Sequence, residues 1–351
     1  MPLAWQIRSA PPKDYRTEIG IENLYLATDL PMPVPEANTT LVRIRAVALN
    51  ARDMMIVAHD PLFPIEAIPD LVLCADGAGV VEAVGEGSVW NVGDKVILNP
   101  AQWIDGEVPD LEGMKVLGGG GIHGTLREYA VMFDSRFIHA PPHLSYEELV
   151  ALPVAASTAM NALFFGPLPL KKGMTVLIQG TGGVSCFLIQ LAAATGATVM
   201  STSSSEDKLS QAASLGATHL VNYKTIPNWS SEVLRLTSGR GVDHVFDVGG
   251  SGSIEQSLAA TRQGGLVSMI GFMDLGEKTD VAPAIVLGAK TVRGVFGYSR
   301  DMVVAMTELM GGKGLRPLIS KVFEFEEAKE AFKALVKQND VGKIVIRVGS
   351  E

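Results

Sequence analysis

The sequence predicts an α/β protein in which a compact β domain accompanies a doubly wound parallel sheet. Short β-like runs at 38–48, 70–84 and 94–99 are separated by turn clusters, which is typical of a compact β domain. From about residue 157 to 297, strand-like and helix-like segments alternate, as in a parallel sheet covered by helices on both faces. The length of 351 residues also suits two domains better than one.

The segment 175–185 carries the most specific signal for a ligand. An apolar run rich in β-branched residues stops at Gly180, and a glycine-rich turn then opens an amphipathic stretch. Such a turn brings backbone N–H groups and a helix N-terminus to one point, which suits a pyrophosphate. Gly180 and Gly182 fit the dinucleotide fingerprint, whereas Ser185 replaces its third glycine. The predicted contacts of this turn are Gly180, Thr181, Gly182, Gly183 and Val184.

The segments that follow complete a βαβ unit. A helix is predicted from Val184 to Ala194 with Gly196 at its C-terminal end, and a second β-rich run follows at 197–202. Ser203 then falls where the residue that reads the ribose of a dinucleotide is expected. Further along, we predict a helix at 206–215 behind Ser205 as N-cap, strands at 243–248 and 266–272, and a strand, helix and strand within 318–350.

Composition excludes several classes of partner. A net charge of −9 without a cluster of lysine or arginine argues against nucleic acid or an anionic membrane as the main partner. No apolar run reaches the roughly 18 residues that span a bilayer, and the N-terminal segment lacks a secretory apolar region. Cys74 and Cys186 are too few for a disulfide framework or a cysteine-rich metal site. We therefore expect a cytoplasmic protein that acts on a small molecule.

Six segments in a fixed order carry a family resemblance. They are Leu49–Asp53, Asp76–Val81, Val92–Val96, Gly124–Tyr129, Ala151–Pro153 with Ser157–Ala159, and the Gly180 turn. Over essentially its whole length the chain resembles the medium-chain dehydrogenase/reductase superfamily. The resemblance implies a GroES-like catalytic domain at 1–155, a Rossmann NADP-binding domain at 156–300, and a return to the catalytic domain at 301–351. It also implies an active site in the cleft between the two domains.

The positions of the catalytic zinc ligands can be compared one at a time with the zinc-dependent members. The first ligand position is Asn50, the histidine-bearing motif is replaced by 74–76 (Cys-Ala-Asp), and the third position is Val154. A catalytic zinc needs about three protein ligands from Cys, His and carboxylate, so the resemblance implies no catalytic metal. The lobe that would hold a structural zinc corresponds to 100–122 and contains no cysteine. These departures place the chain closer to the zinc-free, quinone oxidoreductase-like branch.

That branch implies hydride transfer from NADPH to a quinone or to the activated C=C of an enone or enal. In such substrates the carbonyl already withdraws charge, so a few hydrogen bonds to the developing enolate oxygen suffice. Two alternatives stay open: a dedicated enoyl or ene reductase of a secondary-metabolite pathway, and a non-catalytic NADPH-binding scaffold or sensor. The physiological substrate is not predicted, and a homodimer is expected by analogy alone.

The end of the second predicted strand favours NADPH over NADH. An Asp or Glu there would read a 2′-hydroxyl, but the segment 201–205 holds only serine and threonine. Hydroxyl groups with a nearby cation suit a 2′-phosphate. The predicted contacts of this phosphate are Ser203, Ser204 and Lys208, with Tyr223 matching a position where related enzymes contact the adenosine phosphate.

The resemblance also places residues at the nicotinamide. The predicted contacts are Asn50, Thr158, Ile270, Phe272, Phe296, Tyr298 and Lys343. Asn50, Asp53 and Tyr298 are the candidate catalytic residues. The tyrosine that donates a proton in mitochondrial-type members is missing after the Asn50–Asp53 segment. His59, Tyr298 and water stay open as proton donors.

Overall fold

A computed structural model describes residues 1–63, 66–100, 116–272, 276–277 and 279–349. Most of the polar excursion predicted at 100–122 therefore lies outside the described residues. The chain divides into two compact units, Met1–Ser157 with Tyr298–Glu351, and Thr158–Gly297. No helix in the described residues is both long enough and apolar enough to cross a bilayer.

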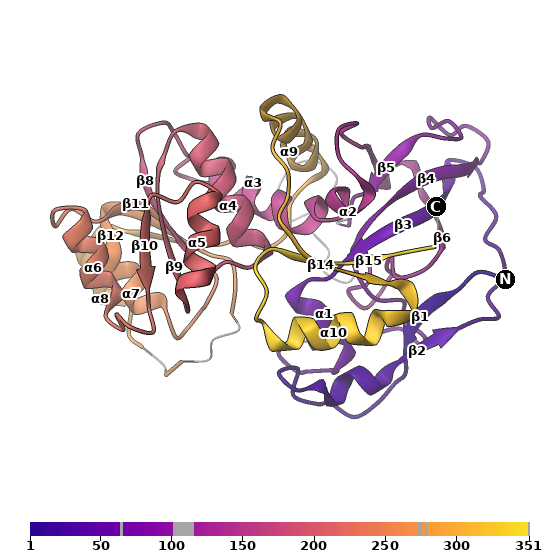
Figure 1. Ribbon diagram of the computed structural model, residues 1–351, viewed down its shortest axis with the longest axis horizontal. Coiled ribbons are helices and arrows are strands. Elements are labelled where there is room, and N and C mark those ends of the chain that lie inside the picture. Colours follow the sequence, from indigo (N-terminus) through magenta and orange to yellow (C-terminus); the bar gives the residue numbers. More distant parts are fainter. Residues whose placement is uncertain (64–65, 101–115, 273–275, 278, 350–351) are drawn as a thin grey trace. The chain divides into compact units, whose positions relative to one another are not determined.

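The first unit is built on a mainly antiparallel sheet (Figure 1). Its strands follow the order β14-β15-β3-β4-β5-β7, and β6 pairs with β3. Their bounds are β3 (Thr39–Ala48), β4 (Asp76–Val84), β5 (Lys95–Leu98), β6 (Tyr129–Phe133), β7 (Phe137–His139), β14 (Ile319–Glu324) and β15 (Lys343–Arg347). A small hairpin of β1 (Ala4–Ile7) and β2 (Leu24–Ala27) accompanies this sheet.

The α-helices of this unit are short apart from two near the C-terminus. They are α1 (Ala51–Val57), α2 (Tyr146–Leu149), α9 (Arg300–Lys313) and α10 (Ala328–Lys337). Single turns of 3-10 helix lie at Glu18–Asn23, Asp134–Arg136 and Phe325–Glu327, and a π-helical turn lies at Leu152–Ala156. α3 (Ser157–Phe164) starts at the last residue of this unit's first segment.

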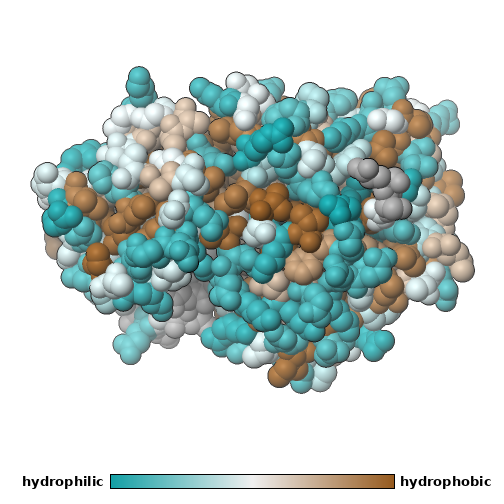
Figure 2. Space-filling view, viewed as in Figure 1, coloured by the Kyte–Doolittle hydropathy of each residue, from teal (hydrophilic) through white to brown (hydrophobic). Residues whose placement is uncertain are grey.

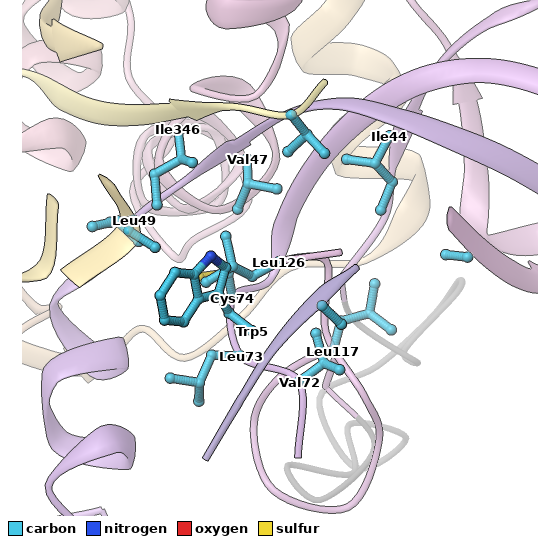
Figure 3. Close-up of a cluster of buried hydrophobic side chains, with 14 of the residues drawn as sticks. Trp5, Ile44, Val47, Leu49, Val72, Leu73, Cys74, Leu117, Leu126 and Ile346 are labelled. Carbon is cyan, nitrogen blue, oxygen red and sulfur yellow. The ribbon is translucent and has the colours of Figure 1, made fainter. Parts of the chain in front are cut away.

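The core of the first unit joins both ends of its chain. Figure 3 shows Trp5 and Leu126 beside Val47 of β3 and Ile346 of β15. β15 pairs antiparallel with β3, so that Ile346 lies opposite Val47. Since burial of such apolar side chains is the main driving force of folding, the C-terminal strand belongs to this core.

The second unit is a six-stranded sheet in which each paired strand is parallel to its neighbour. The strand order β10-β9-β8-β11-β12-β13 is that of a dinucleotide-binding doubly wound fold. Helices accompany this sheet in Figure 1. The strands are β8 (Thr175–Gln179), β9 (Thr198–Ser203), β10 (His219–Asn222), β11 (Val242–Asp247), β12 (Thr261–Met269) and β13 (Thr291–Gly294). The helices are α4 (Gly183–Thr195), α5 (Glu206–Ser214), α6 (Trp229–Leu236), α7 (Ile254–Ala260) and α8 (Ala282–Leu287).

Local signals in this unit place the helix ends well. α4 ends at Gly196, which has a left-handed φ of 86°. The hydroxyl of Ser205 accepts a hydrogen bond from the Lys208 backbone N–H and so caps α5. Both predicted helices are therefore confirmed to within one residue at each end.

Two predicted strands need correction. β12 runs from Thr261 to Met269 rather than over 266–272, and the backbone leaves the sheet before Gly271. A side chain at Gly271 would overlap the Val248 carbonyl. The run predicted at 70–84 starts as a strand only at Asp76, since Cys74 has a φ of 67°, which interrupts an extended backbone.

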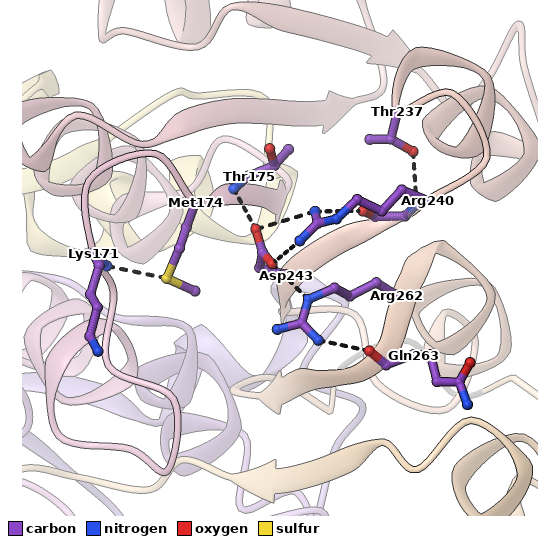
Figure 4. A network of polar contacts seen from close by, with 9 residues as sticks. Lys171, Met174, Thr175, Thr237, Arg240, Asp243, Arg262 and Gln263 are labelled. Atoms are coloured by element: carbon purple, nitrogen blue, oxygen red, sulfur yellow. Dashed lines mark hydrogen bonds and ion pairs between the residues drawn. The ribbon is translucent and has the colours of Figure 1, made fainter.

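The amino ends of the parallel strands carry a polar cluster around Asp243 (Figure 4). The Asp243 carboxylate accepts hydrogen bonds from Arg240, Arg262 and the backbone N–H of Thr175, at 2.6, 2.7 and 2.8 Å. These contacts join β8, β11 and β12 at the amino ends of the strands. The Gly180 turn follows the carboxyl end of β8 and so lies at the opposite end of the strands.

Hydrophilic side chains dominate the face of the molecule in Figure 2, and apolar ones gather in patches. Among the exposed apolar residues, Val286 and Leu287 of α8 are 74% and 82% exposed.

Candidate nucleotide turn and ammonium-centred site

The turn after β8 has the backbone that a phosphate-binding loop needs. Gly180 has a φ of 70°, a conformation that favours glycine, and its N–H donates to the Thr202 carbonyl at 2.7 Å. Gly182 is the N-cap of α4, a helix of 13 residues. A side chain at Gly182 would meet nothing within 4 Å, so the space beside the turn is open. The first N–H groups of α4 therefore have room for an anion.

Ser185 explains the imperfect fingerprint. Its side chain is buried, and its hydroxyl donates to the carbonyl of Gln179, the last residue of β8, at 2.7 Å. The third fingerprint glycine allows close packing of helix on strand. Here a small hydroxyl side chain fills that space and ties α4 to β8, so the departure leaves the phosphate side of the turn unchanged.

The carboxyl ends of β9 and β10 bring several of the predicted 2′-phosphate contacts together. The hydroxyl of Ser203 lies 3.2 Å from that of Thr181, and the Ser203 carbonyl accepts from the Tyr223 N–H at 3.1 Å. Ser204 and Lys208 are half-buried, Lys208 lying in the first turn of α5. Tyr223 is 37% exposed. Ser203 is buried against Thr181, whereas Ser204 and Lys208 supply a half-buried hydroxyl group and a cation near this strand end.

Sequence reasoning overlooked Lys224. Its ammonium lies 5.8 Å from the centre of the Tyr223 ring, which brings a second cation to this strand end. Glu206 is the nearby acid, and its carboxylate accepts a hydrogen bond from Asn222 at 2.7 Å. The turn, the hydroxyl groups and the two lysines fit the adenosine diphosphate portion of a nicotinamide dinucleotide.

The first unit holds a buried cluster around the ammonium of Lys343. The ammonium donates to the Leu49 carbonyl at 2.7 Å, to Asn50 Oδ1 at 2.7 Å and to Asp76 Oδ2 at 3.0 Å. The residue is 3% exposed. These three acceptors match the three N–H donors of a lysine, so no ammonium hydrogen is left for a cofactor. The sequence predicted that Lys343 contacts the nicotinamide, whereas in the structure its ammonium bonds to Leu49, Asn50 and Asp76.

Asp76 is the second member of this cluster and is fully buried. Its Oδ2 accepts from Asn50 Nδ2 at 2.9 Å, in addition to the bond from Lys343. Its Oδ1 accepts from the backbone N–H of Val154 at 2.8 Å. The carboxylate is therefore satisfied by an ion pair and two further hydrogen bonds, as a buried charge requires.

The cluster includes two of the positions that the resemblance aligns with zinc ligands, Asn50 and Val154, and Asp76, which follows the remaining such position, Ala75. Asn50 offers an amide, Val154 offers only its backbone N–H, and Asp76 is already engaged by Lys343. Across the part of the chain that the structure describes, no group of three or more His, Cys, Asp and Glu residues is placed to hold a metal. Zinc needs anionic or imidazole ligands, and an ammonium repels a cation. The donor set does not fit a catalytic zinc.

Asp53 supports the site from the first turn of α1. Its Oδ2 accepts from the Asn50 N–H at 2.8 Å, which holds the residue that starts the helix. Its Oδ1 is buried and has no hydrogen-bond partner among the described residues. Burial raises the pKa of Asp53 to about 6, against the lowering effect of Arg52 and of the bond from Asn50.

Tyr298, the third candidate catalytic residue, is 3% exposed. Burial, together with the Asp76 carboxylate, raises the pKa of Tyr298 well above its ordinary value. Its phenol is therefore protonated at neutral pH, and its role as proton donor stays a prediction. His59 contacts the Arg8 carbonyl through Nε2 at 2.9 Å.

The remaining predicted nicotinamide contacts lie in the second unit. Thr158 is buried in α3, and Asn161 of the same helix donates to the Gly297 carbonyl, next to Phe296, at 2.8 Å. Ile270 is half-buried, whereas Phe272 and Phe296 are 48% and 56% exposed. Exposed aromatic rings are available to a ligand, and their contact with a cofactor stays a prediction.

Asp76 and Lys224 are the candidate site residues that sequence reasoning missed. The signal for Asp76 was present, because a carboxylate opens an apolar strand at 76–84 and a lysine opens another at 343–347. Two opposite charges in buried strands need each other as partners.

Two family models match the chain. The alcohol dehydrogenase GroES-like domain matches residues 36–142, and the model described as zinc-binding dehydrogenase matches residues 183–311. They correspond to the predicted β domain and to most of the parallel-sheet domain.

Relatives and solved structures match over almost the whole chain. A zinc-type alcohol dehydrogenase-like protein of Schizosaccharomyces pombe is 39% identical, covering 88% of this chain and 90% of its own length. The quinone oxidoreductase of Sus scrofa is 26% identical, covering 93% and 94%. The crystal structure of an NAD-dependent alcohol dehydrogenase superposes with a TM-score of 0.88 at 32% identity, covering 99% of this chain and 100% of that one.

Proposed function

This chain belongs to the medium-chain dehydrogenase/reductase superfamily, and we propose that it is an NADPH-dependent, zinc-independent oxidoreductase that reduces a quinone or the activated C=C of an enone or enal. The observation that carries the proposal is the Lys343 ammonium among Leu49, Asn50 and Asp76, next to Asn50 and Ala75, which the resemblance aligns with metal ligands of the zinc-dependent members. Alcohol oxidation in those members uses the metal as a Lewis acid. A site that does not fit the metal favours substrates that need none.

Quinones and enones are substrates that can be reduced without a metal. When bound, a reduced nicotinamide supplies a hydride to the β-carbon of an enone or to a quinone, and the electron pair comes to rest on the carbonyl oxygen. Asn50, half-buried at the start of α1, offers an amide N–H to that oxygen. A proton then completes the reduction. The similarity to a protein named quinone oxidoreductase supports this substrate class.

The strand end at Ser203 supports NADPH as the reductant. A 2′-phosphate carries negative charge, and two lysines follow the ends of the neighbouring strands β9 and β10: Lys208 in the first turn of α5 and Lys224 beside the Tyr223 ring. The last residues of β9 include no carboxylate that would favour a 2′-hydroxyl.

The first test measures oxidation of NADPH and NADH with a quinone, an enal and an enone, with and without a chelator. We expect saturable turnover with NADPH, a much higher KM for NADH, and no effect of the chelator. Tight binding of NADPH without turnover of any acceptor would instead identify a non-catalytic NADPH-binding protein. Inactivation by the chelator would contradict the zinc-independent site.

Replacing Lys208 by alanine tests the cofactor assignment. A hydrogen bond to a charged group contributes about 1.5–3 kcal/mol, so we expect Lys208→Ala to raise the KM for NADPH by roughly 10- to 100-fold. The KM for NADH is expected to change little. Lys313→Ala, in the last turn of α9, is the matched control for loss of an exposed lysine. An equal change in the KM values for NADPH and NADH would show that Lys208 does not contact the 2′-phosphate.

A further inference from the structure

The side chain of Asn50 is held by two charged groups of opposite sign. Its Oδ1 accepts from the Lys343 ammonium at 2.7 Å, and its Nδ2 donates to the Asp76 carboxylate at 2.9 Å. The two charged groups also contact each other at 3.0 Å, so the three side chains form a closed ring of hydrogen bonds. Lys343 and Asp76 are 3% and 0% exposed.

We propose that Lys343 is a positioning residue, which locks the Asn50 carboxamide so that it offers a hydrogen-bond donor to the substrate oxygen. This inference rests on the proposed function, in which an oxygen of the substrate gains negative charge. Lys343 itself does not touch the substrate, because its three donors are used within the cluster. Its effect passes through the orientation of the amide.

The ring of hydrogen bonds is compatible with one orientation of the amide. An ammonium only donates and a carboxylate only accepts. A flipped amide would place Nδ2 against the ammonium and Oδ1 against the carboxylate, which exchanges two charge-assisted hydrogen bonds for two repulsive contacts. In the observed orientation one Nδ2 hydrogen bonds to Asp76, and the second has no acceptor among the residues that the structure describes. Asn50 therefore acts as a donor rather than an ambiguous donor or acceptor.

The local backbone strengthens this orientation. Asn50 starts α1, where its N–H donates to the Asp53 carboxylate at 2.8 Å. The adjacent Leu49 carbonyl accepts from the same ammonium that holds the Asn50 side chain. Backbone and side chain of this position are thus tied to one buried cation, and the donor is in place before a substrate binds.

Preorganised donors have large effects on turnover. Removal of one donor from an oxyanion site lowers kcat by about 10²–10³ in other enzymes. Lys343→Met leaves the Asn50 amide present but free to turn, so we expect kcat to fall by roughly 10- to 100-fold. The KM for NADPH is expected to stay within about twofold, since the amide acts on the developing charge.

Three further variants separate positioning from charge balance. Lys343→Arg keeps a donor to the same acceptors and is expected to recover part of the lost kcat. The double variant D76N/K343M removes both buried charges. Its Tm is therefore expected to lie closer to that of the wild type than the Tm of Lys343→Met does, while its kcat stays low. Lys321→Met in β14, an exposed lysine paired with Asp340, is the matched control. A D76N/K343M variant with wild-type kcat would overturn the proposal, because Lys343 would then only neutralise Asp76.

A second measurement does not depend on activity. In protein labelled with ¹⁵N-asparagine, the Asn50 side-chain amide proton that bonds to Asp76 is expected to exchange slowly with solvent. In D76N/K343M this proton is expected to exchange much faster, because both charged partners are gone. An unchanged exchange rate would contradict the lock. This result stands apart from the proposed function, which fails if the wild-type protein turns over none of the acceptors.

Discussion

The groups around the Asp53 carboxylate stabilise its negative charge poorly. One oxygen accepts from the Asn50 N–H, and the other is buried without a hydrogen-bond partner among the described residues. Burial raises the pKa of Asp53 to about 6, from an ordinary value of 3.8. The folded protein therefore binds a proton at this position more tightly than the unfolded chain does, and its stability decreases as pH rises from about 4 to about 6.

This pKa gives a prediction for Asp53→Asn. The variant keeps an oxygen that accepts from the Asn50 N–H but carries no charge. A pKa of about 6 against an ordinary value of 3.8 corresponds to roughly 3 kcal/mol that ionised Asp53 costs the wild type above pH 6. We expect the Tm of Asp53→Asn, measured relative to the wild type, to be higher at pH 8 than at pH 5. A difference independent of pH would show that Asp53 titrates near its ordinary pKa.

At the scale of elements, the carboxyl ends and the amino ends of the parallel strands carry different kinds of contact. The carboxyl ends of the strands carry the Gly180 turn and the hydroxyl groups of Ser203 and Thr181, which suit a ligand. The amino ends carry Asp243, which joins β8, β11 and β12 through Thr175, Arg240 and Arg262. Burial opposes ionisation of Asp243, but the hydrogen bonds from these partners outweigh it and lower its pKa.

We expect Asp243→Asn to destabilise the protein by roughly 2 kcal/mol at pH 7, since hydrogen bonds to a charged group are lost. Because the folded pKa is lowered, this contribution is present above the unfolded value near 4 and is lost as pH falls through the folded value. Thermal melts of variant and wild type are thus expected to converge below pH 4. Glu232→Gln, which breaks the solvent-facing pair with Arg235, is the control and is expected to change Tm little.

At the scale of the whole molecule, the parallel sheet leaves one edge suited to a second copy. β13 is the last strand of the sheet, and Val292 within it is 38% exposed. The adjoining α8 exposes Val286 and Leu287 by 74% and 82%. An edge strand with unpaired N–H and C=O groups beside apolar side chains is a template for pairing. We propose that the protein forms a homodimer through this edge.

Leu287→Glu tests this assembly. A charge on the exposed apolar face of α8 is expected to convert a dimer to a monomer in sedimentation velocity, with the fold retained by circular dichroism. Leu220→Glu is the matched control, because Leu220 is 40% exposed on β10, the opposite edge of the same sheet. Dissociation by the β10 variant and not by the α8 variant would place the interface elsewhere.

The sequence predicted the elements of the second unit well because their signals are local. Glycine at the end of α4, serine before α5 and β-branched runs for the strands depend on neighbours within a few residues. The end of β12 was predicted less well, because it depends on the approach of Gly271 to Val248, which belongs to the segment after β11. Ser185 was recognised as a departure, but only the structure shows its hydroxyl beneath the turn.

In the candidate active site too, some features follow from the sequence and others only from the tertiary structure. The sequence alone determined that Asn and Val stand at positions 50 and 154, which the family resemblance aligns with zinc ligands, and that no acidic residue ends β9. Tertiary structure decided what stands in place of that donor set. Lys343 lies 293 residues from Asn50 and 267 from Asp76 along the chain, and the pairing of β15 with β3 and of β3 with β4 brings all three together. A buried ammonium must find acceptors wherever the fold provides them, and no local pattern specifies that choice.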